Sequence, residues 1–394
     1  MKRIAIISPG ALPVPAVKGG AVENLITYLV ELNEKENKYK IDLYTIYDSK
    51  IKNRKYKNTN IIFINKNKIS ILKSIILNKI YDKFKLDKMS SWYAEKVIKI
   101  LNKNNINYSK IIVENSMVIF GEIYLKYKRF NNTEVYYHMH NTIYDVKRSE
   151  FLFKIIGENA KKILAVSEFI KEHFNSVFKT DNINVYVNCV DFKKYNYKLN
   201  DEKLNLREKL DIPKYSYNFI FTGRCTEEKG VLELINAYSK LYRENPNISL
   251  TICGMKDNEF ANEVRKATEN LKNIELLGYT TLEKMSKYIA TSDSVVIPSK
   301  CDEAFGMVTL EAMSMAKCII SSDSGGLAET IDNSCGIIVS RNNLEKELYD
   351  AMKKVSLDKA LSDELGKKAF EKVHSEDKYN KENYLKELIK IIGE

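Results

Sequence analysis

The sequence predicts an α/β protein of two doubly wound domains that face each other across a deep cleft, and three observations support this prediction. The chain has 394 residues, more than one hydrophobic core usually holds, so about two domains are expected. Hydrophobic residues make up 44% and charged residues 29%, the proportions of an ordinary globular protein. Short β-like runs alternate with helical stretches throughout, which is typical of parallel sheets covered by helices on both faces.

The β-like runs fall into two sets, one in each half of the chain. The first set is Arg3–Ser8, Ile41–Tyr47, Ile61–Ile64, Lys110–Val113, Glu134–His138 and Ile163–Val166. The second set is Phe219–Thr222, Ser249–Cys253, Ile274–Leu276, Ser294–Ile297, Cys318–Ser321 and Gly336–Val339. A polar segment at residues 191–215, rich in Lys, Asn and Tyr, interrupts the alternation and predicts a linker and the start of the second domain. We therefore expect an N-terminal domain at 1–190, a C-terminal domain at 216–375, and a last helical segment at 376–394 that packs back towards the N-terminal domain.

Several classes of protein are excluded by the composition. No apolar run approaches the roughly 20 residues that span a bilayer, and Met1-Lys2-Arg3 is not followed by the apolar core of a signal peptide. The six cysteines are scattered without zinc-ligand or disulfide spacing, so we expect reduced thiols. These features predict a cytoplasmic protein.

The net charge of +11 comes from one segment of the chain. Residues 51–105 contain 14 Lys or Arg and three acidic residues, an excess of 11, so the remainder is balanced. Apolar residues and lysines alternate from Ile69 to Phe84 at spacings that a helix sorts into two faces. Such a helix suits an anionic membrane surface, and residues 66–88 predict peripheral binding to the inner face of the cell membrane. A lysine-rich solvated face over an ordinary core stripe is the alternative, and no nucleic-acid partner is expected, because no motif for one accompanies the charge.

Ligands of doubly wound sheets bind at the carboxyl ends of the strands, and motifs that suit phosphate follow two of the predicted strands. Gly19 and Gly20 open a helix after the first strand, where glycines let the backbone approach a ligand and exposed amides attract phosphate. Arg224 and Lys229 follow the strand at 219–222, where a guanidinium and an ammonium group can together grip a diphosphate. A plain glycine turn and a loop salt bridge are the structural alternatives.

Two glutamates flank a predicted helix start in the second half. The segment reads Glu303-Ala304-Phe305-Gly306-Met307-Val308-Thr309-Leu310-Glu311. Glu303 is expected in the loop before the helix, and Glu311 about a turn and a half inside it. The amides of residues 305–308 would face the phosphates of a nucleotide, while Glu311 would reach its ribose hydroxyls. A surface helix with two unrelated glutamates is the alternative.

Two of the four histidines, His138 and His140, lie at the end of a predicted strand and point to the same side. This pattern suggests a metal site, but no third ligand has zinc-ligand spacing. We therefore expect His140 to contact either a donor sugar or an acceptor in the cleft, with a structural histidine as the alternative.

Taken together, these motifs resemble glycosyltransferase family four, a group of retaining enzymes with the GT-B architecture of two Rossmann-like domains. The resemblance covers most of the chain and is most specific at Glu303 and Glu311, followed by Ser324-Gly325-Gly326 and Glu329. It implies that the N-terminal domain is the acceptor side and the C-terminal domain binds the nucleotide sugar. The implied site consists of a diphosphate clamp at Arg224, Lys229, Gly19 and Gly20, a donor-sugar and ribose site at Glu303, residues 304–309 and Glu311, a nucleobase pocket at Gly278 and Tyr279, and Glu303 and His140 as catalytic residues.

The implied function is transfer of a hexose or N-acetylhexosamine from a nucleotide diphosphate sugar, with UDP favoured, to a lipid-linked or cell-surface glycan in bacterial polysaccharide synthesis. Arg224 and Lys229 would neutralise the leaving diphosphate, and the chain has no Asp-x-Asp motif, so no metal and no cofactor is expected. A sugar-nucleotide 2-epimerase on the same scaffold and a non-catalytic transferase-like binding subunit are the alternatives. Two residues depart from the family pattern, since Cys189 and Ala304 stand where glycine is common.

Overall fold

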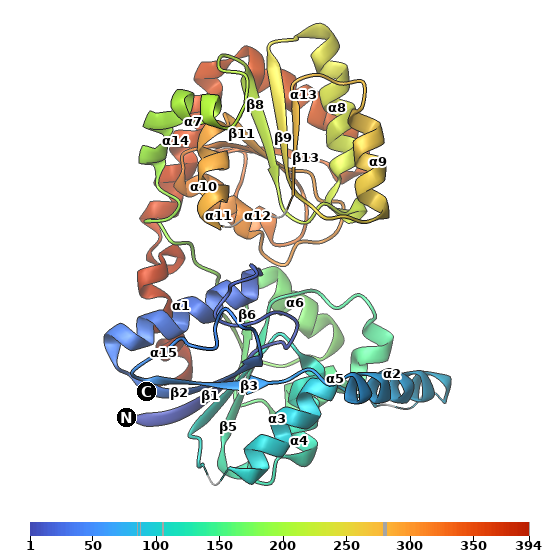
Figure 1. The fold of residues 1–394 in the computed structure, drawn as a ribbon, viewed down its shortest axis with the longest axis vertical. Helices are drawn as coiled ribbons and strands as arrows, with labels where there is room; N and C mark the ends of the chain where they lie inside the picture. The colour runs from blue at the N-terminus through green and yellow to red at the C-terminus, as the bar shows by residue number, and fades with distance from the viewer. Residues whose placement is uncertain (85, 87, 105, 279–281, 394) are drawn as a thin grey trace. The chain divides into compact units, whose positions relative to one another are not determined.

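The computed structural model of the chain consists of two α/β units (Figure 1). It describes all residues except 85, 87, 105, 279–281 and 394. The first unit contains residues 1–187 and 384–394, and the second contains residues 188–383. The predicted borders lay after residues 190 and 375, whereas the units change after residues 187 and 383.

The first unit is built on a seven-stranded parallel sheet in the order β3-β2-β1-β4-β5-β6-β7. Its strands are β1 Lys2–Ile7, β2 Tyr39–Ile46, β3 Thr59–Ile64, β4 Lys110–Glu114, β5 Glu134–Met139, β6 Ile163–Ala165 and β7 Ile183–Val185. Its helices are α1 Ala21–Glu36, α2 Lys68–Lys83, α3 Trp92–Lys103, α4 Met117–Lys126, α5 Val146–Asn159, α6 Glu168–Val177 and α15 Tyr384–Ile392. Because crossover connections are right-handed, α1 and α4 cover opposite faces, with α15 beside α1 and α3 beside α4 (Figure 1).

The second unit has a six-stranded parallel sheet in the order β10-β9-β8-β11-β12-β13. Its strands are β8 Tyr217–Thr222, β9 Ile248–Met255, β10 Ile274–Gly278, β11 Ser294–Ile297, β12 Cys318–Ser322 and β13 Ile337–Val339. Its helices are α7 Lys203–Lys209, α8 Val231–Glu244, α9 Glu259–Thr268, α10 Leu282–Thr291, α11 Met307–Ser314, α12 Leu327–Thr330, α13 Leu344–Leu357 and α14 Lys359–Ser375. The strand order reverses between β8 and β11, which places the loops after these two strands at the ligand-binding position of a doubly wound sheet.

The predicted fold class is confirmed, because both units are doubly wound, Rossmann-like α/β domains with parallel sheets. Every predicted strand is present with its ends within two residues of the expected positions. The strand β7 was missed, since Asn184 interrupts its sequence Ile183-Asn184-Val185 and leaves no continuous apolar run. The predicted cleft between the domains stays a prediction.

Residues 191–215 are not an extended linker, because they fold as part of the second unit. They contain α7, and Tyr195, Leu206 and Ile212 are at most 6% exposed. Arg207 on α7 is buried and donates to the carbonyl oxygens of Thr291 and Ser216 (2.8 and 2.7 Å). The segment is therefore held by its own packing, despite its polar composition.

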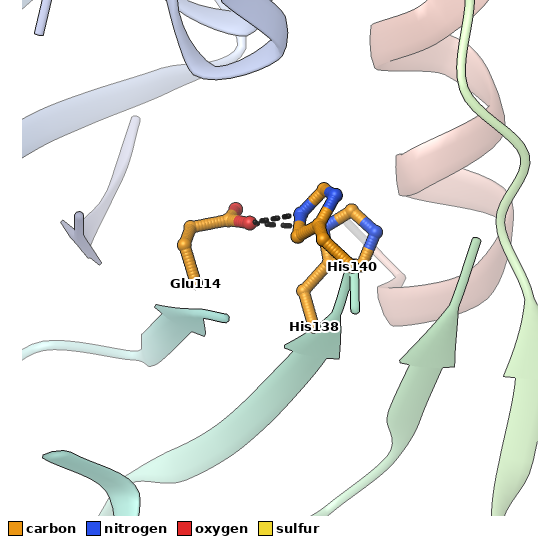
Figure 2. A group of neighbouring side chains, drawn as sticks. All are labelled: Glu114, His138 and His140. Atoms are coloured by element: carbon orange, nitrogen blue, oxygen red, sulfur yellow. Dashed lines mark hydrogen bonds and ion pairs between the residues drawn. The ribbon is translucent and has the colours of Figure 1, made fainter. Parts of the chain in front are cut away.

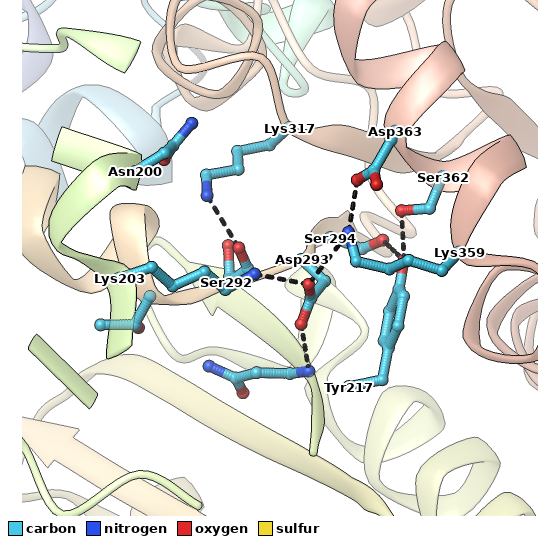
Figure 3. A network of polar contacts seen from close by, with 12 residues as sticks. Asn200, Lys203, Tyr217, Ser292, Asp293, Ser294, Lys317, Lys359, Ser362 and Asp363 are labelled. Atoms are coloured by element: carbon cyan, nitrogen blue, oxygen red, sulfur yellow. Dashed lines mark hydrogen bonds and ion pairs between the residues drawn. The ribbon is translucent and has the colours of Figure 1, made fainter. Parts of the chain in front are cut away.

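A buried polar network fixes this segment to the amino ends of the central strands (Figure 3). Asp293, directly before β11, accepts hydrogen bonds from Lys203 and Arg207 (2.5 and 2.7 Å). Burial alone would raise the pKa of Asp293, but the two cations lower it to about 2. Lys317 is 4% exposed and donates to the carbonyl oxygen of Ser292 (2.7 Å). The network lies at the end of the sheet opposite to the predicted ligand motifs, so it supports the fold rather than the site.

The last helix, α15, completes the first unit. Tyr384, Leu385 and Leu388 on this helix are at most 2% exposed. The carbonyl oxygen of Ile392 accepts hydrogen bonds from Lys110 Nζ (3.0 Å) and the Tyr136 hydroxyl (3.1 Å). A cation at the carboxyl end of a helix is favourable for its dipole. The helix begins at Tyr384, and residues 376–383 of the predicted C-terminal segment remain with the second unit.

Candidate functional site

The two central strands of the second sheet carry the predicted donor motifs. The amides of Lys300 and Cys301, after β11, donate to the carbonyl oxygen of Glu228, after β8 (2.8 and 3.2 Å). Gly230 has a φ of 68°, and a Cβ at this position would lie 1.9 Å from the carbonyl oxygen of Pro298. Glycine is therefore required for the two loops to approach each other.

This approach brings Lys229 and Glu303 together. Lys229 Nζ donates to Glu303 Oε1 (2.6 Å), and the Ser299 hydroxyl donates to the same oxygen. The Glu303 amide donates to Ser324 Oγ (3.1 Å), and the Glu303 carbonyl accepts from the Gly326 amide (2.7 Å). The Ser-Gly-Gly motif thus fixes the backbone that carries Glu303.

Gly306 turns this loop into α11. Its φ is 85°, and a Cβ there would lie 2.1 Å from Cδ2 of Leu327. Glu303 lies in the loop, and Glu311 lies within the helix. This arrangement agrees with the one expected from the spacing, and the ligand contacts of both glutamates stay predictions.

The residues between the two glutamates divide into core and surface. Phe305 and Thr309 are 3% and 0% exposed, so their side chains are buried in the domain. Ala304, Met307 and Val308 are half-buried. A ligand at this helix start would therefore meet the backbone of Phe305 and Thr309 rather than their side chains.

Glu311 is a half-buried acid with an unusual pKa. Burial raises the pKa of Glu311 to about 7, although the Tyr195 hydroxyl and Lys194 lower it. Such a carboxyl group changes charge near neutral pH. Once ionised, its two oxygens can accept hydrogen bonds from a pair of hydroxyls.

The other predicted donor residues lie in exposed loops or outside the described residues. Arg224 is exposed, in the same loop as Lys229. Gly278 is exposed at the end of β10, where the register with β9 shifts. Tyr279 lies outside the residues that the structure describes.

Cys189, one of the two residues that depart from the family pattern, fits the fold without a glycine. Cys189 is fully buried, and it is not among the described residues with positive φ, so glycine is not needed there. Its neighbour Val190 donates its amide to the carbonyl oxygen of Tyr379 (2.9 Å). The carbonyl oxygen of Val190 accepts from the Lys381 amide (3.0 Å).

In the first unit, the predicted glycine pair begins α1. Gly19 and Gly20 have φ values of 74° and 99°. A Cβ on Gly20 would lie 2.1 Å from Oε2 of Glu23, a residue that is 5% exposed. Burial raises the pKa of Glu23, and the charge of Glu114 raises it further. Neither of these two acids was predicted as a site residue from the sequence.

His140 forms a buried cluster with Glu114 and His138 at the carboxyl end of the first sheet (Figure 2). Oε2 of Glu114 lies 3.0 Å from Nδ1 of His138 and 2.9 Å from Nε2 of His140. Glu114 and His138 are 1% exposed, and His140 is 6% exposed. Glu114 was missed because only the register of β4 with β5 pairs it with His138. Its position directly after the apolar run 111–113 was the available signal.

The cluster combines an ionised carboxylate with a neutral imidazole. Burial lowers the pKa of His140 to about 4, and His138 also lowers it, while Glu114 raises it. Burial alone would raise the pKa of Glu114, but the two histidines lower it to about 2. The three residues are also of the types that bind metal ions, with ligand atoms within 4.8 Å of one another. Glu114 is thus a third possible metal ligand beside the two histidines, and it was not predicted from the sequence. The expectation that the protein uses no metal stays a prediction.

Residues 202–372 match the family Glycosyl transferases group 1. The second unit is a glycosyltransferase group 1 domain. The match spans the loops that carry Lys229, Glu303 and Glu311, so the predicted glycosyltransferase relationship is confirmed for this domain, and membership of family four stays a prediction.

Curated relatives agree with this family, and solved structures share the fold. The lipopolysaccharide 1,2-N-acetylglucosaminetransferase of Salmonella typhimurium is 27% identical over 248 residues, which cover 61% of each chain. The chain spans about three fifths of the length of the first curated relatives it matches. HepE of Anabaena, solved in complex with UDP-glucose, has a TM-score of 0.76 at 15% identity over 99% of both chains. WaaG, a glycosyltransferase involved in lipopolysaccharide biosynthesis, has a TM-score of 0.73 at 15% identity over 99% of this chain and 100% of its own. The chain that contains the glycosyltransferase group 1 domain thus has the GT-B fold.

Proposed function

We propose that the protein is a retaining glycosyltransferase that transfers a hexose or N-acetylhexosamine from a nucleotide diphosphate sugar without a metal ion or cofactor. The observation that carries this proposal is the Lys229–Glu303 ion pair after β8 and β11, within the domain that matches the family. It combines a cation for a diphosphate and a carboxylate for sugar hydroxyls at the carboxyl ends of the central strands.

UDP is the favoured nucleotide, and the proposed acceptor is a lipid-linked or cell-surface glycan in bacterial polysaccharide synthesis. Two similarities support these choices. HepE was solved with UDP-glucose, and the Salmonella relative is named as a lipopolysaccharide N-acetylglucosaminetransferase. In this proposal Glu311 accepts hydrogen bonds from the ribose, and Gly278 and Tyr279 face the base. The proposed location is the cytoplasm, at the inner face of the membrane.

The proposed reaction breaks the bond between the anomeric carbon and the diphosphate. Negative charge then develops on a phosphate oxygen and positive charge on the carbon. Arg224, Lys229 and the amides at the start of α11 would stabilise the phosphate. The acceptor hydroxyl would attack on the same face and give its proton to the leaving phosphate, which retains the anomeric configuration. Glu303 would hold the hydroxyls of the transferred sugar.

The first experiment is a thermal-shift panel of UDP, GDP, dTDP and their sugars, with either magnesium or EDTA. We expect UDP and UDP-sugars to raise the melting temperature equally in both conditions, because a ligand of the folded state alone stabilises it. Transfer from the UDP-sugar that binds is then measured with lipid-linked glycan acceptors by mass spectrometry. Turnover of the UDP-sugar without acceptor would favour the 2-epimerase, and the absence of any shift would favour the non-catalytic subunit.

The diphosphate clamp is tested by Arg224→Ala and Lys229→Ala. Each should weaken UDP-glucose binding by about 10- to 100-fold in calorimetry, because each removes a charged hydrogen bond to phosphate. Arg243→Ala, which removes an exposed guanidinium at the last turn of α8, is the matched control and should bind normally. Wild-type affinity in both clamp variants would remove the assignment.

The helix α2 supports the proposed location at the membrane. Ser74 is the one residue of α2 that is buried, and Ile71, Leu77 and Tyr81 are half-buried, so the helix packs on its surroundings along one narrow stripe. Four apolar side chains that are 41–79% exposed share one face of the helix, namely Ile69, Leu72, Ile76 and Ile80. Lys73, Lys79 and Lys83 flank this face. Residues 85 and 87 of the predicted segment lie outside the described part, and no described helix has the length and apolarity to cross a bilayer.

We infer that this face of α2 binds an anionic lipid surface, with the isoleucines and leucine in the interface and the lysines near the headgroups. Replacing Lys73, Lys79 and Lys83 with Glu should reduce co-sedimentation with phosphatidylglycerol vesicles at least tenfold, while UDP-glucose affinity is kept. The control replaces the exposed Lys266, Lys272 and Lys367 with Glu, which changes the net charge equally. Equal vesicle binding by both variants would overturn this role of α2.

A further inference from the structure

One oxygen atom of Glu114 contacts both histidines of the buried cluster (Figure 2). An ionised carboxylate only accepts hydrogen bonds, so each ring nitrogen beside Oε2 must carry a proton. His138 is then protonated on Nδ1, and His140 is protonated on Nε2. The shared oxygen therefore fixes the two neighbouring imidazoles as opposite tautomers.

The backbone holds this arrangement from both strands. Asn115, directly after β4, has a φ of 51° and donates its amide to the carbonyl oxygen of His138 (2.8 Å). Its side-chain Oδ1 accepts from the His140 amide (3.0 Å). The His138 ring packs beside Tyr186, with centroids 5.2 Å apart. Both rings are thus oriented before any ligand binds.

The tautomers decide which nitrogen atoms carry a free lone pair. In His140 the lone pair is on Nδ1, the atom that does not face Glu114. In His138 it is on Nε2, which is buried and has no hydrogen-bond partner among the described residues. A neutral His140 with its lone pair on Nδ1 accepts a hydrogen bond and cannot donate one from that atom.

We propose that Glu114 is a positioning residue that fixes His140 as the Nε2–H tautomer, so that Nδ1 accepts a hydrogen bond from a hydroxyl of the sugar substrate. This inference rests on the proposed transferase function for its ligand, and on the geometry of the cluster with an ionised Glu114 for the tautomer. A metal ion bound by the cluster would require the reverse pattern. The cation would take the lone pairs of His138 Nδ1 and His140 Nε2, and the protons would move to the other ring nitrogens.

The tautomers are measured by NMR on protein with ¹⁵N-labelled histidine at pH 7, with and without EDTA. The chain has four histidines, so single substitutions to Gln assign the spectrum. We expect a protonated Nε2 and a bare Nδ1 for His140, and the opposite for His138. A protonated Nδ1 on His140, a doubly protonated ring, or a spectrum that changes when EDTA removes a bound metal would each overturn the proposal.

Glu114→Gln tests the positioning role, because it keeps the shape of the side chain and removes its charge. We expect His140 to become a mixture of tautomers and kcat to fall about 10- to 100-fold. The affinity for UDP should stay unchanged, because UDP lacks the sugar that His140 is proposed to contact. The control is Glu122→Gln on α4, which removes an acid paired with Lys126 on the helix surface. Unchanged kcat in Glu114→Gln would contradict the role of Glu114.

The two levels of the proposal fail separately. If no sugar nucleotide is turned over but the tautomers are as expected, the transferase function fails and the geometry of the cluster stands. If transfer occurs but His140 is not the Nε2–H tautomer, this inference fails and the transferase function stands.

Discussion

Glu311 differs from a free glutamate because the folded protein holds its proton more tightly. Burial raises its pKa from 4.5 to about 7. A raised pKa in the folded state stabilises the fold fully below about pH 4.5, and this contribution is lost as the pH rises through about 7. A ribose that donates hydrogen bonds to the carboxylate favours the ionised form, so nucleotide binding and proton binding should oppose each other.

The affinity for UDP-glucose should therefore rise up to about tenfold between pH 6 and pH 8, as the ionised fraction of Glu311 rises from about one tenth to nine tenths. UDP-glucose is preferable to UDP, because its phosphates do not titrate in this range. Glu311→Gln should bind weakly at both pH values, whereas the exposed Glu345→Gln should keep the wild-type slope. Equal wild-type affinity at pH 6 and pH 8, measured by calorimetry, would rule out the ribose contact.

Residues of the second unit could be singled out from the sequence because each lies in a short motif beside a strand. Lys229 and Glu303 are such cases, and the structure brings them to 2.6 Å. Glu114 could not be found in this way, because its partners are on the next strand and the register that joins them is a property of the sheet. The pKa of Glu311 was equally hidden, since it depends on burial by residues distant in the sequence.

The loop between β8 and α8 shows how glycine controls an element. Gly230 has a φ of 68°, and a side chain there would meet the backbone of Pro298, which cannot rotate away. The loop after β8 and the loop after β11 therefore separate if this residue gains a Cβ. Separation would also part Lys229 from Glu303.

Gly230→Ala should lower the free energy of unfolding by about 3 kcal/mol and weaken UDP-glucose binding at least tenfold. Gly393→Ala is the matched control, because Gly393 also has a positive φ, 74°, but apart from its chain neighbours no described residue has an atom within 4 Å of its Cβ position. This variant should lower the free energy of unfolding by only about 1 kcal/mol, the cost of a left-handed backbone for a residue with a Cβ. Chemical denaturation measures both values, and equal losses would show that the contact with Pro298 is unimportant.

Strands were predictable as elements because a buried parallel strand is a nearly continuous apolar run. The segment 191–215 was interpreted as a linker because lysine and asparagine dominate it. In the structure its Lys203 and Arg207 pair with Asp293, a partner 86 to 90 residues later that composition cannot reveal. The local pattern of apolar residues therefore predicts where helices and strands lie. Whether a polar segment is folded depends on ion pairs with residues distant in the sequence.

At the scale of the whole molecule, the first domain is discontinuous in sequence. Residues 1–187 need residues 384–394 to complete their packing. Lys110, Lys162 and Tyr136 donate to the last carbonyl groups of α15. The return of the C-terminal helix was an expectation from its apolar spacing. The position where the helix begins, Tyr384, was not predicted.

Leu388→Asp should destabilise the first domain by several kcal/mol, because it places a charge at a site that is 2% exposed. Hydrogen–deuterium exchange should become faster over residues 1–187 and stay unchanged over 188–383. Lys386→Asp, on the exposed side of the same helix, should leave both regions unchanged. Faster exchange spread evenly over the whole chain would contradict the division into two units.

This discontinuity reverses the order in which the domains can be finished on the ribosome. Translation at about 5–20 residues per second takes about 10 to 40 s to make the second domain, and the nascent first domain lacks α15 during all of that time. The second domain is complete before the last helix emerges. A premature stop near the end of the message would therefore damage the domain encoded at its beginning.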